Sequence, residues 1–466
     1  MSFELKQSTQ FEIKKLAIVS KFGTFDISGI FAELNIFDSV LMPCMSGNIM
    51  ISDSIGLTQQ LKFDGSEYIR VDISKSEDNT SVLSIKKTFR VYKQSNRTNI
   101  NQSSENYILS FVSEEFIYSE QKKVNQAYIG KYSDAAASIL LNYLKIPRQK
   151  IGIIDETNGI HKSIIPLLSP IESLDWLLKR SVNSNNLANF VFFENKAGFN
   201  FASLSTLYEF DSLFTVNFQP KNIIENLSSE FLGVRNFNFV SSFDLVDNIK
   251  NGFFANKFIG FDILTRTITQ NELGMSNVFG KQNLNKYPNG STGVNRENKD
   301  LSEMYDSKVA LYPFQKSRFN TTYVKTNDNA AATIIDDTHT YIPQRKAIFN
   351  NLLQKKICIS LPGNFAISSG FVLNLQSHSY SLQTEKNSKD DSINGRYLII
   401  GTRHMIKPNK HETICELAAD STNNALIDAN TLDLRKARNE WCNLLILLVK
   451  MVLYGGLVWL KIVLTL

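Results

Sequence analysis

Short apolar runs separated by turn residues dominate two distant stretches of the chain, and this pattern constrains the fold most. The runs of the first stretch, residues 11–113, are rich in β-branched and aromatic residues, which favour strands. They lie at 16–19, 26–31, 34–38, 49–53, 68–73, 88–92 and 107–112. Gly23, Gly47 and Gly65 punctuate them, and we expect a turn or bulge at these glycines. Many short strands with intervening turns predict a sandwich or a barrel.

The second strand-rich stretch lies near the other end of the chain and has about the extent of the first. Its predicted strands are residues 357–361, 371–375, 397–400 and 413–417, preceded by a strand near 237–240 and a helix at 343–354. The segment 282–308 is rich in Asn, Gly and charged residues and is typical of a long loop. No repeat of residues relates the two stretches, so a duplication would be structural only.

A segment of different character separates the two stretches. Ser133 is a predicted N-cap for a helix over 134–141, which should end before Pro147. Ser169-Pro170-Ile171-Glu172 combines a capping box with proline at the first helical position and predicts a second helix. Residues 191–194 and 198–201 flank Asn195-Lys196-Ala197, as in a hairpin. We therefore expect an α+β unit over 114–207.

Composition excludes several classes of protein. Hydrophobic residues make up 43% and charged residues 20%, as in an ordinary folded chain. The 50 basic and 45 acidic residues give a net charge of +5 without a dense basic run, so a dedicated DNA-binding surface is not predicted. The four cysteines lie far apart, which argues against a disulfide framework or zinc ribbon, and Cys415 is expected to be a small buried residue. The first residues lack the apolar core of a signal peptide, so we expect synthesis in a reducing cytoplasm.

Motifs for catalysis, cofactors or metals are missing from the sequence. GxSxG, HExxH and GxGxxG do not occur, and residues 274–282 have the wrong spacing for a phosphate loop. No two histidines are spaced i and i+4, although His404 and His411 are expected to face each other across a hairpin as ordinary sheet residues. Asp336-Asp337-Thr338-His339, Glu114-Glu115 and Asp390-Asp391 are more typical of turns and solvated loops than of acid/base chemistry. We predict no catalytic residue, no cofactor, no metal site and no enzymatic activity.

Three ordered stretches together resemble the baseplate hub protein of T-even-like contractile-tailed phages. The first is the run 31–38 followed by 42–54, in which an acidic strand leads to Gly47 and to a strand ending in Asp53-Ser54, with the turn 65–67 after it. The second comprises 242–244, 251–257 and 261–262. The third comprises 361–363, 370–372, 395–399 and 403–404, and it also resembles tail-hub and type VI secretion spike proteins. The resemblance covers about residues 10–420.

This resemblance implies a β-dominated α+β fold with two similar antiparallel β-barrel tube-type domains and smaller α+β side domains. We place the first barrel at 1–113, the α+β side domain at 114–207, and the second barrel at 208–250 and 320–420. An irregular side domain is inserted at 251–319, and 421–466 is a C-terminal extension. The resemblance also implies a homotrimer whose six barrels form a pseudo-sixfold ring in the tail baseplate of the virion. The implied partners are the tail spike or spike-lysozyme protein, the tail tube protein and baseplate wedge proteins, with DNA only as transiting cargo. The resemblance identifies no interface residue.

The apolar segment 444–466 departs from the composition of the rest of the chain. Its 23 residues are long enough for a membrane-spanning helix, although Lys450 would lie at an unfavourable depth. A membrane-contacting helix, a helix buried in an assembly and an altered reading frame are the three explanations. We favour the altered frame because the composition shifts abruptly after Glu440.

Two other functions compete with the structural hub. A membrane-anchored binding protein would use the C-terminal helix as its anchor. Deleting residues 442–466 would then make the chain soluble. A cell-wall hydrolase ranks last, because the sequence offers no acid and nucleophile pair for such a reaction.

Overall fold

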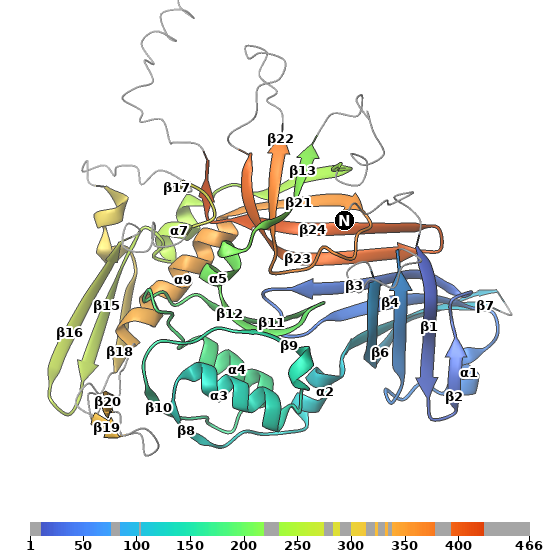
Figure 1. Ribbon diagram of the computed structural model, residues 1–466, viewed down its shortest axis with the longest axis horizontal. Coiled ribbons are helices and arrows are strands. Elements are labelled where there is room, and N and C mark those ends of the chain that lie inside the picture. Colours follow the sequence, from blue (N-terminus) through green and yellow to red (C-terminus); the bar gives the residue numbers. More distant parts are fainter. Residues whose placement is uncertain are drawn as a thin grey trace, which may run out of the picture. The chain divides into compact units, whose positions relative to one another are not determined.

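The computed structural model describes residues 11–75, 84–101, 104–218, 233–274, 283–288, 300–313, 322–324, 331–333, 338–377 and 393–423. All of them lie in the first of the two units into which the chain divides, residues 1–424. Strands predominate over helices among these residues, as the sequence predicted. Figure 1 shows the helices and strands of these residues with their labels.

The N-terminal strand unit contains seven strands of the predicted barrel. They are β1 (Glu12–Ser20), β2 (Gly23–Asp26), β3 (Phe31–Ser39), β4 (Ser46–Asp53), β5 (Tyr68–Ser74), β6 (Ser84–Asn101) and β7 (Ser104–Ser113), with the short helix α1 (Leu57–Leu61) after β4. Neighbours pair antiparallel in the order β2-β1-β5-β6-β7-β4-β3. In β5, Ile69, Val71 and Ile73 are buried while Arg70 is exposed, because successive side chains of a strand point to opposite faces.

Two predictions within this unit were wrong. The run 26–31 is not a strand: β2 ends at Asp26, a turn follows with Ile27 fully buried in it, and β3 begins at Phe31. Gly47 lies inside β4 rather than at a turn, and a side chain there would collide with the backbone oxygen of Asn35 and the ring of Phe111. Glycine is thus required at position 47 because neighbouring atoms come too close for a Cβ atom.

The α+β segment follows β7 and has its own core. Its elements are α2 (Glu114–Glu120), β8 (Ala127–Gly130), α3 (Tyr132–Ser138), a π-helical turn (Ile139–Tyr143), a 3-10 turn (Arg148–Lys150), β9 (Ile151–Ile154), β10 (His161–Ile164), α4 (Pro170–Leu178), β11 (Phe190–Asn195), β12 (Gly198–Ser203) and α5 (Leu204–Glu209). The strands form two small sheets, β8 with β10 and β9 with the hairpin β11–β12.

The two helix starts predicted for this segment had different outcomes. The capping box is confirmed: the Ser169 hydroxyl accepts the Glu172 N–H, and the Glu172 carboxylate accepts the Ser169 N–H at 2.8 Å. Ser133 is not an N-cap, because α3 already begins at Tyr132 after Lys131. The Ser133 hydroxyl instead accepts the backbone N–H of Thr157, so a contact distant in sequence replaced the predicted local one.

The C-terminal strand unit contains β13 (Ser212–Phe218), β14 (Asn236–Ser241), β21 (Lys355–Pro362), β22 (Val372–Ser377), β23 (Gly395–Lys407) and β24 (Lys410–Ala419). Its order is β13-β22-β23-β24-β21-β14. Counting strands along each unit and leaving out β2, both units have the order 1-4-5-6-3-2. The expectation of purely antiparallel pairing was wrong at one position, because β13 and β22 run parallel whereas β1 and β5 run antiparallel.

The segment between β14 and β21 contains regular structure rather than irregular structure alone. It comprises α7 (Leu245–Lys250), β15 (Ala255–Asp262), β16 (Thr267–Gly274), β17 (Tyr287–Pro288), two 3-10 turns (Leu301–Glu303, Tyr305–Ser307), β18 (Val309–Pro313), β19 (Thr322–Val324), β20 (Ala331–Thr333) and α9 (Thr338–Gln354). Strands β16, β15 and β18 form a three-stranded sheet, and β17 pairs with β25 (Ser421–Thr422) after β24. Helix α9 confirms the predicted helix and begins five residues earlier, with Pro343 inside it.

The two strand units are continuous with each other. Strand β3 pairs antiparallel with the C-terminal half of β23, and this pairing joins the strands of both units into one 13-stranded sheet of described residues. Figure 1 shows the orange-red β23 beside the blue β3, although these strands lie at opposite ends of the chain.

Candidate functional site at the seam between the strand units

The β3–β23 seam holds together residues that are more than 350 positions apart. Residues Leu34–Ser39 lie opposite Gly401–Ile406, with Asp38 facing Thr402 and Ile36 facing His404. All four of these side chains are buried. The seam is therefore a packed interior contact between the units.

A buried carboxylate closes the seam at one end. Asp38 accepts the backbone N–H of Ser369 at 3.1 Å and the hydroxyls of Ser368 and Thr402. Burial raises the pKa of Asp38 to about 6, and the hydrogen bonds from Ser368 and Ser369 oppose that rise. Because its partners come from β23 and from the loop before β22, Asp38 ties β3 to two separate parts of the C-terminal unit.

A charged cluster closes the other end. The Glu33 carboxylate accepts the Asn35 amide at 2.8 Å and lies 3.2 Å from Arg403 and 3.3 Å from Lys407. The Arg403 Nε–H also donates to the side-chain amide oxygen Oδ1 of Asn35 at 2.8 Å. The Asn35 hydrogen bond and then Lys407 hold the pKa of Glu33 below its usual value. These half-exposed groups favour one register of the seam, because a slip of one residue would separate them.

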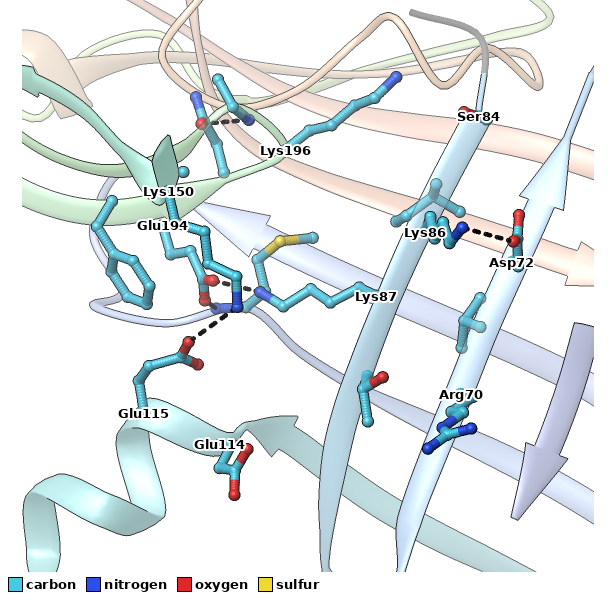
Figure 2. Close-up of a pocket in the computed structure, with 18 of the residues that line it drawn as sticks. Arg70, Asp72, Ser84, Lys86, Lys87, Glu114, Glu115, Lys150, Glu194 and Lys196 are labelled. Atoms are coloured by element: carbon cyan, nitrogen blue, oxygen red, sulfur yellow. Dashed lines mark hydrogen bonds and ion pairs between the residues drawn. The ribbon is translucent and has the colours of Figure 1, made fainter. Parts of the chain in front are cut away.

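The hairpin β11–β12 connects the α+β segment with both strand units, and Figure 2 shows its central contact. The buried Glu194 carboxylate accepts the Met45 N–H at 2.9 Å and the Ser113 hydroxyl, and it pairs with the Lys87 ammonium group. These partners belong to the N-terminal unit. At the tip of the same hairpin, Asn195 donates to the carbonyl oxygen of Ser369 at 2.9 Å.

A cavity of about 580 Å³ opens beside Glu194 and is lined by both signs of charge. The basic and acidic residues that line it are Lys15, Arg70, Lys86, Lys87, Lys150, Lys196, Asp72, Glu114, Glu115 and Glu194. Several are paired across it, Lys150 with Glu115 at 3.5 Å and Lys86 with Asp72 at 3.8 Å, as the dashed lines in Figure 2 mark. Such a mixed, internally paired lining offers no strong preference for either an anion or a cation.

The pair Glu114-Glu115 lies in this wall and takes part in structural contacts. Glu114 accepts the Tyr68 hydroxyl at 2.8 Å, and Glu115 pairs with Lys150. The sequence-based expectation of a solvated loop was wrong for this pair, because both residues lie in the first turn of helix α2.

His404 and His411 lie near each other on the β23–β24 hairpin, with ring centroids 5.6 Å apart, but they are not directly opposed: His404 faces Thr413, and His411 faces Ile406. The Phe365 ring stacks on His411 at 4.2 Å. Burial lowers the pKa of His404 to about 4 and that of His411 well below its usual value. Both rings are therefore neutral core groups near pH 7. Neither ring nitrogen of His411 has a hydrogen-bond partner among the described residues.

Other sequence candidates fall partly outside the described residues. Of the loop 274–282 only Gly274 is described, at the end of β16, and Asp336, Asp337, Asp390 and Asp391 are not described. Cys415 is buried in β24, as expected. Within the described ranges, no group of three or more His, Cys, Asp and Glu residues has the geometry of a metal site. No helix among the same residues is long and apolar enough to cross a membrane, and the segment 444–466 lies outside them.

Sequence reasoning missed both Asp38 and Glu194. A signal was present for Glu194, since it follows the apolar run Val191-Phe192-Phe193 in a strand whose residues are all buried. A buried carboxylate in such a strand requires partners, and this requirement marks it as a contact residue. For Asp38 no comparable signal exists, because its three donors lie about 330 or more residues away in sequence.

Comparison with known proteins finds similarity to phage and prophage tail proteins. No family model matches the chain. It is 20% identical over 443 residues to a probable baseplate hub protein of Vibrio phage KVP40, and the match covers 91% of this chain and 99% of that protein. The fold is similar to a 43 kDa tail protein of prophage MuSo2 from Shewanella oneidensis, with a TM-score of 0.51, 9% identity, and coverage of 88% and 99% of the two chains. It is also similar to a tail protein from Neisseria meningitidis MC58, with a TM-score of 0.50, 10% identity, and coverage of 87% and 96%. The chain is thus similar over most of its length to a probable phage baseplate hub protein, the kind of protein that the three sequence motifs resemble.

Proposed function

We propose that the chain is a structural subunit of a phage tail baseplate hub that assembles as a trimeric ring. The observation that carries this proposal is the shared strand order of the two units, 1-4-5-6-3-2 in each. Two alike units per chain provide six alike positions in a trimer, so one ring can present both threefold and approximate sixfold symmetry. Such a ring suits a junction between a sixfold tail tube and a threefold spike.

The seam gives the proposal a physical basis. It joins the two units by six consecutive backbone pairs, and it is reinforced by the buried Asp38 and by the hairpin carrying Glu194. Two units fixed in one relative orientation can repeat that orientation around an axis, which a flexible linkage would not allow. The proposed partners are the spike or spike-lysozyme protein, the tail tube protein and baseplate wedge proteins. DNA passes through the channel as cargo, and the mild net charge of +5 suits a conduit that must not retain it.

Light scattering on the purified full chain tests this proposal, together with electron microscopy of the same sample. We expect a particle of three times the mass of one chain, alone or with its spike partner, and a ring with a central channel in projection. A stable monomer that binds neither tube nor spike protein would contradict the proposal. Peptidoglycan incubated with the chain should stay intact, because the proposed role is structural.

A further inference from the structure

The fifth strands of the two units, β6 and β23, are alike in more than their order. Pairing of β5 with β6 ends at Arg90, and pairing of β22 with β23 ends at Leu398. In each strand a bulge follows at once on the opposite side, between Val91 and Lys93 in β6 and between Ile399 and Gly401 in β23. Val91 therefore occupies in the N-terminal unit the position that Ile399 occupies in the C-terminal unit.

Beyond the bulge the two strands differ in one respect. Strand β23 continues with β3 as its new neighbour, opposite Gly401–Ile406. Strand β6 continues to Asn101, still paired with β7, yet no strand of the described residues pairs with its other side beyond Arg90. The same edge of the fifth strand is thus paired with β3 in β23, whereas in β6 it has no partner strand among the described residues.

The second strands, β3 and β14, show the complementary difference. Each pairs with the third strand of its unit, β4 or β21, but only β3 has a partner on its other side among the described residues. The sequence of β14, NFNFVS over Asn236–Ser241, contains no lysine or proline. Edge strands that are protected against pairing often carry these residues.

Exposure separates the filled edges from the open ones. In the seam, Ile36 of β3 and Ile406 of β23 are both 0% exposed. On the open edges, Phe239 and Val240 of β14 are 43% and 50% exposed, and Tyr92 of β6 is 54% exposed. Apolar side chains on an open strand edge favour association with another strand.

We propose that β14 of one copy pairs antiparallel with the segment of β6 that begins at Lys93 in the next copy. The proposal rests on the proposed function and names its interface. The contact would repeat between copies the β3–β23 seam found within each copy. The contact is heterologous, so three seams and three contacts between copies close a ring of three chains if each turns the next strand unit by about 60°.

The register follows from matched paths across the strands. In the N-terminal unit, Val91 faces Phe111 of β7, Phe111 faces Gly47 of β4, and Gly47 faces Ile36 of β3. In the C-terminal unit the same path runs through Ile399, Leu417, Ile357 and Phe239.

Phe239 therefore corresponds to Ile36. Within the chain, Phe37, which follows Ile36, faces Arg403 of β23. Strand β14 has a bulge between Phe239 and Ser241, and Ser241 faces Lys356 as Phe37 faces Ser46. The equivalent residues at the open edges are therefore Ser241 and Ser95. We expect Ser241 of one copy to lie opposite Ser95 of the next.

Disulfide trapping of the full chain tests this register. Directly opposed residues of an antiparallel pair have Cα atoms about 4.5–5.5 Å apart, within the range that a disulfide spans. Under mild oxidation, the double variant S95C/S241C should give covalent dimers and trimers on non-reducing gels. A mixture of the two single variants should give only dimers. The control S95C/N236C moves one cysteine five residues along β14, about 17 Å away, and should not cross-link.

A second pair of variants separates failure of the interface from failure of the proposed function. V240K places a charge on the open edge and should convert the trimer to monomers, whereas I164K, at a residue 64% exposed on β10, should leave it trimeric. If the chain is a trimer but V240K stays trimeric and S95C/S241C does not cross-link, the interface lies elsewhere and the hub function stands. If the unmodified chain neither trimerises nor binds tube or spike protein, both proposals are overturned.

Discussion

Replacing Glu194 by glutamine should weaken the junction of three parts of the chain at once. The carboxylate is buried and accepts the Met45 N–H, the Ser113 hydroxyl and the Lys87 ammonium group. Glutamine has nearly the same shape but no charge, so the ammonium group of Lys87 would lose its counter-ion. Breaking a buried pair by removing one partner costs about 3–5 kcal/mol. Because the Lys87 side chain is 19% exposed and water can partly solvate it, we expect the lower end, about 3 kcal/mol.

Urea unfolding of the full chain, followed by circular dichroism at one protein concentration, measures this loss. The matched control is Glu156→Gln, which breaks the pair of Glu156 with Lys131. The Glu156 side chain is 75% exposed, so that change should stay within about 0.5 kcal/mol. Adding Lys87→Met to Glu194→Gln should recover about 1 kcal/mol or more, since no uncompensated charge then remains. Equal effects of the Glu194 and Glu156 variants would refute the reasoning that Glu194 joins these parts.

Three further changes test other parts of the fold. Gly47→Ala should destabilise the N-terminal unit by about 1–3 kcal/mol, measured by thermal unfolding, because the new methyl group collides with the Asn35 oxygen and the Phe111 ring. Wild-type stability should fall by up to about 2 kcal/mol between pH 7 and pH 5 through His411 alone: its folded pKa lies well below the unfolded value, so the unfolded chain binds the proton first. His411→Phe should remove that part of the loss, and an unchanged pH dependence of unfolding would contradict this explanation. Ser169→Ala should cost about 1 kcal/mol through loss of the helix cap, and Ser169→Thr should retain most of it.

Local features of the fold could be predicted from the sequence because their causes are local. The strand at 68–73 and the capping box at Ser169 depend on a few neighbouring residues, and both predictions are confirmed. The wrong predictions at Gly47 and Ser133 share the opposite cause. Gly47 is required by its closeness to Phe111 on β7, and the Ser133 hydroxyl accepts from Thr157. A residue pattern within one strand or helix contains no information on such contacts.

The pairing of β3 with β23 could not be predicted either, because it depends on contacts between residues far apart in the sequence. Its six residue pairs join positions 34–39 to 401–406, and no motif in either run requires the other. Resemblance to hub proteins implied two alike barrels, yet it said nothing of which strand edges meet. That information entered only with the register of the pairs.

The first strands of the two units, β1 and β13, differ in direction. The proposed ring tolerates this difference because it does not use these strands. Strands β1 and β13 differ in direction relative to β5 and β22, whereas the other five strands of the two units agree in order and direction. The contacts proposed for the ring use only the second and fifth strands, β3 or β14 and β23 or β6. Those strands must stay alike for six positions to be equivalent, while the first strand lies at the far end of each strand order and is free to diverge. Replacing β13 by the sequence of β1 should therefore destabilise the C-terminal unit without changing the symmetry of the ring. A change in ring symmetry on such a replacement would show that the first strand also takes part in the contact between copies.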